Sequence, residues 1–333
     1  MDCEERAFMK TIRWGIIGCG DVTEVKSGPG FQKARGSELV AVMRRTGEKA
    51  KDYARRHNVP RWYDDADQLI GDPEVDAVYI ATHPDTHKEY ALRVARAGKP
   101  VYVEKPMGLN YQHGLEMVQG CARANVPLFV AYYRRALPKF LRVKKILESK
   151  RLGEIRAVEV LMRQQIKKRD TQDGGSWRVR PEISGGGHFP DVGSHALDLI
   201  DFLLGPIVEA QGMGANQSKT YRAEDIVWGH FKTHQGVAGV GTFLFNTYTD
   251  DDWTTIHCEK GDLAYSVLDL NQPIVIRTKE GTETIAGDPP PAHVAQPFIQ
   301  TVVDELLGIG TCPSTGESAL RTDWVLARLA GTI

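Results

Sequence analysis

The sequence predicts an α/β fold, with an N-terminal doubly wound parallel sheet followed by an α+β domain on a large, mostly antiparallel open sheet. Three observations predict it. Between residues 11 and 131, apolar segments of strand length alternate with amphipathic segments of helix length. The first apolar segment ends in a glycine turn, and from residue 154 onward short segments alternate apolar and polar side chains. At 333 residues the chain is longer than most single domains, so we predict two, residues 1–126 and 127–333.

Composition excludes several classes of partner. Charged residues make up 26% of the chain and the formal net charge is −1, so no basic field favours nucleic acid or anionic lipid. No apolar run approaches the ~20 residues that span a bilayer. The short acidic N-terminus, which we expect to be frayed over its first ten residues, is unlike a signal peptide. The five cysteines are far apart and odd in number, which is typical of reduced thiols, so we expect a cytoplasmic protein.

The predicted strands of the first domain are short, apolar and rich in β-branched residues, and they span residues 11–18, 38–43, 60–63, 75–82, 99–104 and 127–131. Predicted helices span 47–57, 86–97 and 110–124, the second opened by a capping box of Thr86 and Glu89. In such sheets ligands bind beyond the carboxyl ends of the strands. The chain places the glycine turn, Thr82-His83 and Glu104-Lys105 at these ends, so we expect one ligand site there.

The glycine turn reads G-x-G-x-x-T, a variant of the dinucleotide fingerprint in which Thr23 replaces the third glycine. The first two glycines allow a tight turn and a close approach of the backbone to pyrophosphate, whereas the third mainly concerns helix–strand packing. We therefore predict dinucleotide contacts from Gly18, Cys19, Gly20, Asp21 and Val22.

The residues after the second strand bear on the choice of cofactor. An NAD site usually carries Asp or Glu at this position, where it bonds the ribose 2′-hydroxyl. This chain has Arg44-Arg45-Thr46, and two guanidiniums suit a 2′-phosphate. The alternative is that both arginines are merely solvated. We predict NADP(H) in preference to NAD(H), with Arg44 and Arg45 as contacts.

The segment from Thr82 to His87 carries two histidines four residues apart, which raises the possibility of a metal site. Pro84 predicts a turn there in place of a helix face, and a zinc site would need three or four ligands. We predict no metal. A turn that lines the cofactor through Thr82, His83 and His87 is preferred, and histidines that only cap the turn are the alternative.

The strand at Val101–Val103 ends abruptly in Glu104-Lys105-Pro106. Pro106 has no N–H to donate to the sheet, so it ends the strand. Two charged side chains beside a buried strand cost free energy unless they interact with a partner or a ligand. We therefore predict that Glu104 and Lys105 face a ligand bound above the sheet.

In the second domain, predicted strands of alternating polarity span residues 155–162, 226–233, 237–245, 254–259, 262–267 and 274–278. A basic amphipathic helix is predicted at 138–150, and helices at 194–204 and 297–307 are expected to cover one face of the sheet. Residues 288–291 are predicted to form a surface loop.

A glycine-rich run at 185–187 leads into a predicted helix over residues 190–204. At 100° per residue, Asp191, His195 and Asp198 share a stripe opposite the apolar face. Histidine suits proton transfer near pH 7, and a neighbouring carboxylate can orient it. The alternative is an aspartate that stabilises the helix dipole beside an exposed histidine. We expect Asp191 and His195 to act together with Lys105 over a nicotinamide ring.

These residues resemble the Gfo/Idh/MocA family (glucose–fructose oxidoreductase, inositol dehydrogenase and relatives) over nearly the whole chain, residues 12–329. The resemblance is carried by the glycine turn, Glu104-Lys105-Pro106, Trp177-Arg178, and residues 185–195, which read like the family's G-G-G…D-x-G-x-H. Tyr133-Arg134-Arg135 stands where relatives often have Asn-Arg-Arg. The resemblance implies a Rossmann domain and a second domain whose open sheet is often used for oligomerisation, so we expect a dimer or tetramer.

The resemblance also implies roles for matching residues. Lys105 would contact the substrate oxygen and the nicotinamide ribose, Asp191 would position the substrate, and His195 would donate or accept the proton. Tyr133 would contact the substrate, although it departs from the commoner Asn. Trp177-Arg178 is similar to a segment that approaches the cofactor in NADP-using relatives.

The predicted function is hydride transfer between NADP(H) and a carbonyl or secondary alcohol of a sugar-like or cyclic polyol substrate. Two alternatives stay open at this point. One is glycoside cleavage with tightly held NAD(H) and no net redox change, against which the Arg44-Arg45 pair argues weakly. The other is a non-catalytic nucleotide-binding sensor, which would not need the proton-transfer set of Lys105, Asp191 and His195.

Overall fold

The structure, a computed structural model, describes residues 11–172, 175–287 and 289–333. The described chain divides into two compact units, each assembled from three segments. The first contains residues up to 105, 115–136 and 291–316, and the second contains 106–114, 137–290 and 317–333. The predicted division at residue 126 stays a prediction. Predictions for residues 1–10 and 288 lie outside the described residues.

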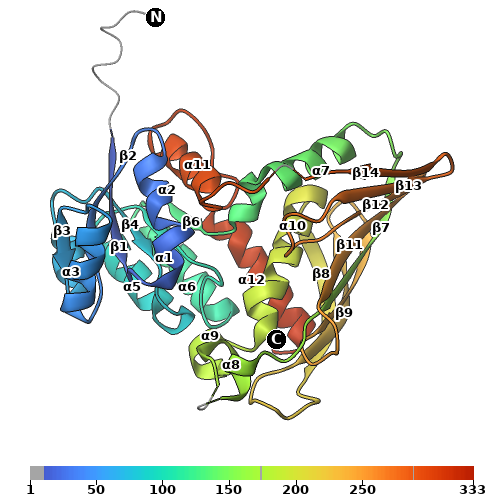
Figure 1. The fold of residues 1–333 in the computed structure, drawn as a ribbon, viewed down its shortest axis with the longest axis horizontal. Helices are drawn as coiled ribbons and strands as arrows, with labels where there is room; N and C mark the ends of the chain where they lie inside the picture. Colours follow the sequence, from blue (N-terminus) through green and yellow to red (C-terminus); the bar gives the residue numbers. More distant parts are fainter. Residues whose placement is uncertain (1–10, 173–174, 288) are drawn as a thin grey trace, which may run out of the picture. The chain divides into compact units, whose positions relative to one another are not determined.

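The first unit contains the predicted parallel sheet (Figure 1). Its six strands are all parallel, in the order β3-β2-β1-β4-β5-β6. The strand bounds are β1 (Ile12–Ile17), β2 (Ser37–Met43), β3 (Arg61–Tyr63), β4 (Ala77–Ile80), β5 (Val101–Val103) and β6 (Leu128–Val130). The helices are α1 (Asp21–Val25), α2 (Gly28–Lys33), α3 (Gly47–Arg56), α4 (Ala66–Gly71), α5 (Pro84–Arg96), most of α6 (Tyr111–Arg123), and α11 (Gln296–Leu306).

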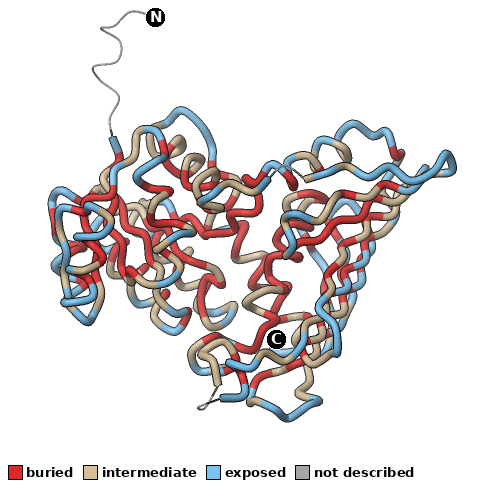
Figure 2. The backbone as a smooth tube through the Cα atoms, viewed as in Figure 1, coloured by how far each residue is buried: buried red, intermediate tan, exposed pale blue. Residues whose placement is uncertain are grey.

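The two faces of this sheet are packed differently. On one face, Trp14, Tyr79 and Tyr102 form an aromatic cluster with Phe31 of α2, with ring centroids 4.9 Å apart for Trp14–Phe31 and 4.7 Å for Tyr79–Tyr102. Phe298 of α11 joins it, 5.9 Å from Tyr102. On the other face, α4 lies so close to β1 that a Cβ at residue 15 would come 2.7 Å from a Leu69 methyl group. Both faces are therefore covered, as continuous apolar strands require, and Figure 2 shows β1, β4, β5 and β6 almost entirely in the colour of buried residues.

The second unit contains an eight-stranded sheet in the order β14-β13-β12-β11-β7-β10-β9-β8. All neighbours are antiparallel except β7 and β10, which confirms a mostly antiparallel sheet. The strands are β7 (Ile155–Arg163), β8 (Ile207–Ala215), β9 (Ile226–Thr233), β10 (Ala238–Leu244), β11 (Asp251–Cys258), β12 (Gly261–Tyr265), β13 (Ile274–Thr278) and β14 (Gly281–Ile285). The sequence did not predict β8 or β14.

One face of this sheet is buried and the other is open. Along β7, Val158, Val160 and Met162 are buried, whereas the side chains between them are at least partly exposed. Helices of this unit are α7 (Pro138–Glu148), α8 (Lys168–Thr171), α9 (Pro181–Ser184), α10 (Ser194–Leu204) and nearly all of α12 (Gly316–Ala330). Residues 212 and 229 lie against α12, and a Cβ at either would come within 2.7 Å of Leu329. Glycine at both positions therefore lets α12 lie directly on the strands.

The prediction that the helix near 297–307 covers the second sheet is wrong. This helix, α11, belongs to the first unit, where it packs against α2 and the 3-10 helix η2 (Tyr133–Ala136). The covering helix that the sequence did not predict is α12. Both helices are amphipathic, and periodicity shows only that a helix has an apolar face, not which sheet that face covers.

The prediction of a turn at Pro84 and a capping box at Thr86 is also wrong. Helix α5 begins at Pro84, with His83 at the N-cap. Proline is favoured at the first helical position because its missing N–H has no partner there in any case. The two histidines therefore lie at the N-cap and in the first turn of a helix.

Two further properties bear on the sequence predictions. None of the helices in the described ranges combines the length and hydrophobicity that a bilayer crossing requires. The described cysteines, Cys19, Cys121, Cys258 and Cys312, are thiols, and Cys3 lies outside the described residues.

Candidate active site

The glycine turn follows β1 directly. Gly18 has φ +92°, and a Cβ there would lie 2.8 Å from Thr82 Cγ2 and 3.0 Å from the Ala81 carbonyl carbon. The amides of Gly18 and Cys19 both donate to the Met43 carbonyl oxygen, at 2.9 and 3.2 Å. The turn is therefore fixed by β2 and pressed against the end of β4, so only glycine fits at position 18.

Gly20 has a different environment. It is the N-cap of α1, and the nearest atom to a Cβ there would be the Gly18 carbonyl oxygen, 3.8 Å away. The protein itself thus leaves room for a side chain at this position. A bare backbone facing open space is what close approach of a pyrophosphate requires, and Asp21 and Val22 follow in the first turn of α1.

Arg44 and Arg45 follow β2, as predicted. Arg44 Nη1 donates to the Cys19 carbonyl oxygen at 3.3 Å, and its amide donates to the Tyr63 carbonyl oxygen. The structure therefore brings one arginine beside the glycine turn. Arg45 is exposed.

The end of β4 is ordered by two side chains. Thr86 Oγ1 donates to Thr82 Oγ1 at 2.8 Å, and His87 Nε2 lies 3.1 Å from the Thr82 carbonyl oxygen. His87 is fully buried and His83 is exposed. His87 thus contacts the backbone at the end of β4, and its predicted contact with the cofactor stays a prediction. Thr82 lies beside Gly18, at the edge where a ligand contact was predicted.

Glu104, at the end of β5, is a buried carboxylate with several partners. Oε1 accepts a hydrogen bond from the Tyr79 hydroxyl at 2.6 Å and lies 3.6 Å from Lys26 Nζ, and Oε2 accepts from the Lys105 amide at 3.3 Å. Burial acts to raise the pKa of Glu104, but Lys26, Tyr79 and Lys105 outweigh it and hold the pKa below its usual value. Glu104 is therefore a charged brace for the turn that carries Lys105.

A second side chain lies close to this turn. Tyr133, the first residue of η2, is buried, and its hydroxyl accepts a hydrogen bond from Arg134 Nη1 at 3.1 Å. Lys26 Nζ lies 4.5 Å from the centroid of its ring, and Lys105 acts on it electrostatically. The sequence did not predict Lys26 as part of the site, because a lysine at the end of a five-residue helix shows no periodicity that would single it out.

In the second unit, each of the three glycines at 185–187 has a packing reason. Gly185 has φ +80°, and a Cβ there would lie 2.3 Å from the Leu109 carbonyl oxygen. Cβ atoms at Gly186 and Gly187 would come within 2.8 Å of Glu224. The Gly187 amide donates to Glu224 Oε1 at 2.8 Å, while burial raises the pKa of Glu224. This packing fixes the loop just before Asp191.

The prediction of one α-helix from residue 190 is wrong. Residues Phe189–Gly193 form a π-helical turn, and α10 begins only at Ser194. The segment before Ser194 is therefore wound more widely than the α-helix from which the stripe was predicted, and the joint placement of Asp191, His195 and Asp198 stays a prediction. His195 and Asp198 are buried, which contradicts the alternative of an exposed histidine beside a dipole-stabilising aspartate. π-Turns inside helices are frequent at functional sites.

Asp191 and the Trp177-Arg178 segment lie together. Arg178 Nε donates to Asp191 Oδ2 at 2.9 Å, and its guanidinium carbon lies 4.4 Å from the Trp177 ring centroid. The stacking orients the guanidinium and the guanidinium in turn orients the carboxylate. The structure thus joins two predicted site segments that are separate in the sequence.

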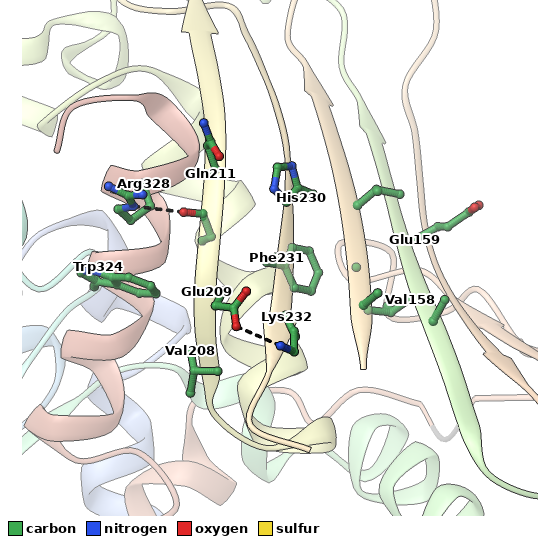
Figure 3. Close-up of a pocket in the computed structure, with 15 residues that line it drawn as sticks. Val158, Glu159, Val208, Glu209, Gln211, His230, Phe231, Lys232, Trp324 and Arg328 are labelled. Atoms are coloured by element: carbon green, nitrogen blue, oxygen red, sulfur yellow. Dashed lines mark hydrogen bonds and ion pairs between the residues drawn. The ribbon is translucent and has the colours of Figure 1, made fainter. Parts of the chain in front are cut away.

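A hollow of the second unit lies elsewhere (Figure 3). It has a volume of about 670 Å³ and is lined by β7, β8, β9 and β10 together with Trp324 and Arg328 of α12. None of the predicted site residues lines it. Within the described ranges, no group of three histidine, cysteine or acidic residues is arranged to hold a metal ion.

Comparison with known proteins adds to this geometry. Residues 12–132 match the model of the GFO/IDH/MocA oxidoreductase family with an NAD-binding Rossmann fold, and residues 140–264 match the GFO/IDH/MocA C-terminal domain. Oxidoreductase P35 of Formosa agariphila is 37% identical over 96% of this chain and 99% of its own length. The 1,5-anhydro-D-fructose reductase of Ensifer adhaerens is 26% identical over 95% and 93%. Among solved structures, the WlbA dehydrogenase of Bordetella pertussis, in complex with NADH and UDP-GlcNAcA, has a TM-score of 0.81 and 26% identity, covering 96% and 94%.

Proposed function

Because this chain belongs to the GFO/IDH/MocA family of oxidoreductases, we propose that it transfers a hydride between NADP(H) and a carbonyl or secondary alcohol of a sugar-like or polyol substrate. The observation that carries the chemistry is the turn after β5, where a buried carboxylate braces Lys105 at the carboxyl edge of the parallel sheet. The cofactor fits the chain: the turn at Gly18 has no room for a side chain, and Gly20 presents bare backbone to solvent. When bound, the nicotinamide supplies or accepts the hydride.

The residues of the chain have separate tasks in this proposal. In the reducing direction His195 donates a proton to the oxygen that becomes the hydroxyl. Lys105 stabilises the negative charge that develops on that oxygen. Asp191, held by Arg178, anchors a substrate hydroxyl. Trp177 and Arg178 stay proposed neighbours of the cofactor.

A panel of keto-sugars and polyols with NADPH or NADP⁺ tests this, with the absorbance of the reduced nicotinamide as readout. We expect turnover by the natural chain and a loss of 100-fold or more in kcat for both site variants. For His195→Asn this follows from general acid catalysis of about 10²–10⁴-fold, and for Lys105→Met from the loss of charge stabilisation of about 10²–10³-fold. His234→Asn and Lys49→Met, both at exposed positions, are the matched controls. Unchanged turnover in the two site variants would refute the assigned roles. Release of a chromogenic aglycone without net cofactor change would instead favour the glycosidase alternative.

The preference for NADP(H) is supported by Arg44 and Arg45, since no carboxylate occupies the position after β2 that would bond a 2′-hydroxyl. Each charge-assisted hydrogen bond to a 2′-phosphate contributes about 1.5–3 kcal/mol. The double variant Arg44→Ala/Arg45→Ala should therefore lose at least tenfold in kcat/KM with NADPH and little with NADH. Arg55→Ala, on the exposed side of α3, is the control. Equal losses with both cofactors would contradict the preference.

The nature of the substrate is supported by the relatives. A reductase of 1,5-anhydro-D-fructose and a dehydrogenase bound to UDP-GlcNAcA both handle sugar-like molecules. The thiol form of the four cysteines in the described ranges supports the predicted cytoplasmic location.

We also propose that the open face of the second sheet joins copies of this chain. Apolar side chains are exposed on four adjacent strands, and they are Leu161, Met213, Trp228 and Val240. Trp228 pairs across strands with Met213 and with Thr242, and Thr242 pairs with Leu161, so these residues form a continuous row across the four strands. Val240 lies two residues before Thr242 on β10, on the same face. Light scattering should give a dimer or tetramer, and Trp228→Glu should shift it toward the monomer. A natural chain that is monomeric at micromolar concentration would refute this.

A further inference from the structure

A buried aspartate–histidine pair, Asp170 and His188, joins two segments of the second unit that both lead to Asp191. His188 Nε2 lies 2.7 Å from Asp170 Oδ2, and the two side chains are 3% and 0% exposed. Asp170 belongs to α8, and His188 immediately precedes the π-helical turn that carries Asp191. The sequence did not predict either residue of the pair as part of the site.

The same two segments meet a second time at Arg178 and Asp191. Arg178 Nε donates to Asp191 Oδ2 at 2.9 Å, but these side chains are 30% and 15% exposed, so solvent weakens this contact. Gly175, with φ +81°, couples the two contacts, because a Cβ there would lie 3.1 Å from both the Asp170 carbonyl oxygen and Val179 Cγ2. A single contact leaves two segments free to rotate about it, whereas two contacts fix their relative orientation.

The buried pair does little for stability, which argues against a purely structural role. An ionised carboxylate can only accept, so the proton of the neutral imidazole is on Nε2. Among the residues that the structure describes, neither His188 Nδ1 nor Asp170 Oδ1 has a hydrogen-bond partner. Buried charged pairs are often no more stabilising than apolar side chains of similar volume, and unsatisfied buried atoms in a folded protein call for an explanation. The orientation of Asp191 provides one.

Lys167, Arg169 and Asp191 are charged groups near the pair. Arg169 Nε lies 3.9 Å from Asp170 Oδ1, and Lys167 and Asp191 both act electrostatically on His188. Burial lowers the pKa of His188, although Asp170 acts in the opposite direction, so the imidazole is neutral near pH 7. The pair therefore keeps one directional hydrogen bond at the pH where the proposed reaction is assayed.

We propose that Asp170 and His188 are positioning residues, whose hydrogen bond holds the Asp191 carboxylate in the orientation that anchors a substrate hydroxyl. The inference rests on the proposed function, in which Asp191 has that task. A hydrogen bond is directional, so an apolar pair of similar size would keep the packing but not the mutual orientation of Arg178 and Asp191. No covalent step is involved.

The orientation is tested without any substrate, by hydrogen exchange of the arginine side chains in the ¹⁵N-labelled chain. We expect one protected Nε–H signal that Arg178→Lys removes, and another from Arg321, whose Nε donates to Asp201 at 2.9 Å. The double variant Asp170→Leu/His188→Leu should speed exchange of the Arg178 signal by at least about tenfold. It should leave the Arg321 signal, which reports that the unit is folded, unchanged. His188→Gln, which keeps a donor for Asp170, should preserve both signals.

A second aspartate–histidine pair of the same unit provides the matched control. His257 Nδ1 lies 2.8 Å from Asp262 Oδ1 at a partly exposed position, and His257→Leu/Asp262→Leu should leave the Arg178 signal unchanged. Equal acceleration in this control, or unchanged exchange of the Arg178 signal in Asp170→Leu/His188→Leu, would overturn the inference. Loss of the Arg321 signal as well would mean that the buried pair holds the fold itself, and would also overturn it.

Kinetics with the sugar of the panel that turns over fastest measure the effect on the substrate. Asp170→Leu/His188→Leu should raise KM for that sugar by at least about tenfold, and His188→Gln should largely restore it. Asp191→Asn should cause a similar loss, and combining it with the double variant should add little, because the pair acts through Asp191. Additive losses would overturn the inference. If no sugar turns over, the proposed function fails, while the exchange measurements still decide whether the pair orients Arg178 and Asp191.

Discussion

Glu104→Gln removes one charge from the best-defined cluster of the first unit. The natural carboxylate accepts hydrogen bonds from the Tyr79 hydroxyl at 2.6 Å and from the Lys105 amide at 3.3 Å, and it lies 3.6 Å from Lys26 Nζ. The amide keeps the shape and can still accept one of these bonds. It cannot balance the ammonium, and its NH₂ group is a donor directed at another donor.

The magnitude follows from these contacts. Hydrogen bonds to a charged group contribute about 1.5–3 kcal/mol each, and breaking a buried ion pair from one side costs about 3–5 kcal/mol. A quarter of the Lys26 side chain is solvent-accessible, so its ion pair is worth less than a fully buried one. We expect Glu104→Gln to lower the free energy of unfolding by about 2–4 kcal/mol near pH 7.

The pH dependence has a definite sign. The pKa of Glu104 is lowered in the folded chain, so its contribution is complete above its ordinary pKa and is lost as the pH falls through the folded value. The stability gap between the natural chain and Glu104→Gln should therefore be full at pH 7 and narrow below about pH 4.5.

Urea titration followed by hydrogen exchange of peptides covering β4 and β5 measures this gap, because the readout then belongs to the first unit alone. Glu89→Gln, which removes an exposed carboxylate from α5, is the control and should cost less than about 1 kcal/mol. A loss below about 0.5 kcal/mol at pH 7, or a gap that does not narrow in acid, would refute the argument that Glu104 is a charged brace.

Three further predictions concern the backbone and buried charges. Gly18→Ala should lower the free energy of unfolding by at least about 1–2 kcal/mol, because residue 18 has a positive φ. Gly20→Ala should leave the melting temperature nearly unchanged but weaken dinucleotide binding, measured by calorimetry. Equal effects of the two variants on stability would contradict the different roles assigned to the two glycines. Burial raises the pKa of Asp323 well above its usual value, so ionisation of this carboxyl increasingly destabilises the fold as the pH rises. In urea titrations, Asp323→Asn should raise the free energy of unfolding by about 1–3 kcal/mol at pH 8 and by less at pH 5. No gain in stability at either pH would contradict this prediction. Burial lowers the pKa of His188, so stability should fall as the pH drops below about 6.5. In thermal melts, His188→Gln should reduce this dependence of the melting temperature on pH below about 6.5. An unchanged dependence would exclude His188 as the cause of the acid destabilisation.

Most of the parallel sheet could be predicted because its strands are continuous apolar runs bounded by turn residues. Strand β8 was missed because Gly212 and Gly214 interrupt its pattern, and those glycines are explained by the adjacent α12, which is remote in sequence. Strand β14 was missed because it is polar and mostly exposed, so no alternation marks it. The start of α5 was missed because Pro84 indicates a turn as readily as a first helical residue.

The candidate site shows the same limit. Motifs pointed to Lys105, Asp191 and His195, and those assignments stay predictions. The spacing of residues along the sequence could not predict contacts between distant segments, such as those of Arg178 with Asp191 and of Lys26 with Glu104. The π-turn at Phe189–Gly193 was equally hidden, because a single-residue widening of a helix leaves no mark on hydrophobic periodicity.

The first unit is discontinuous in sequence, so it cannot be completed on the ribosome until its last segment has been synthesised. Residues 291–316 supply Phe298 beside Tyr102 and the Pro313 carbonyl oxygen that accepts from Arg135. The end of this segment, residue 316, lies 180 residues beyond residue 136, so at roughly 5–20 residues per second the nascent sheet waits on the order of 10–40 s with one aromatic flank uncovered. A chaperone that holds exposed aromatic surface has that interval in which to bind, and an expression fragment ending near residue 136 would carry the same uncovered flank permanently.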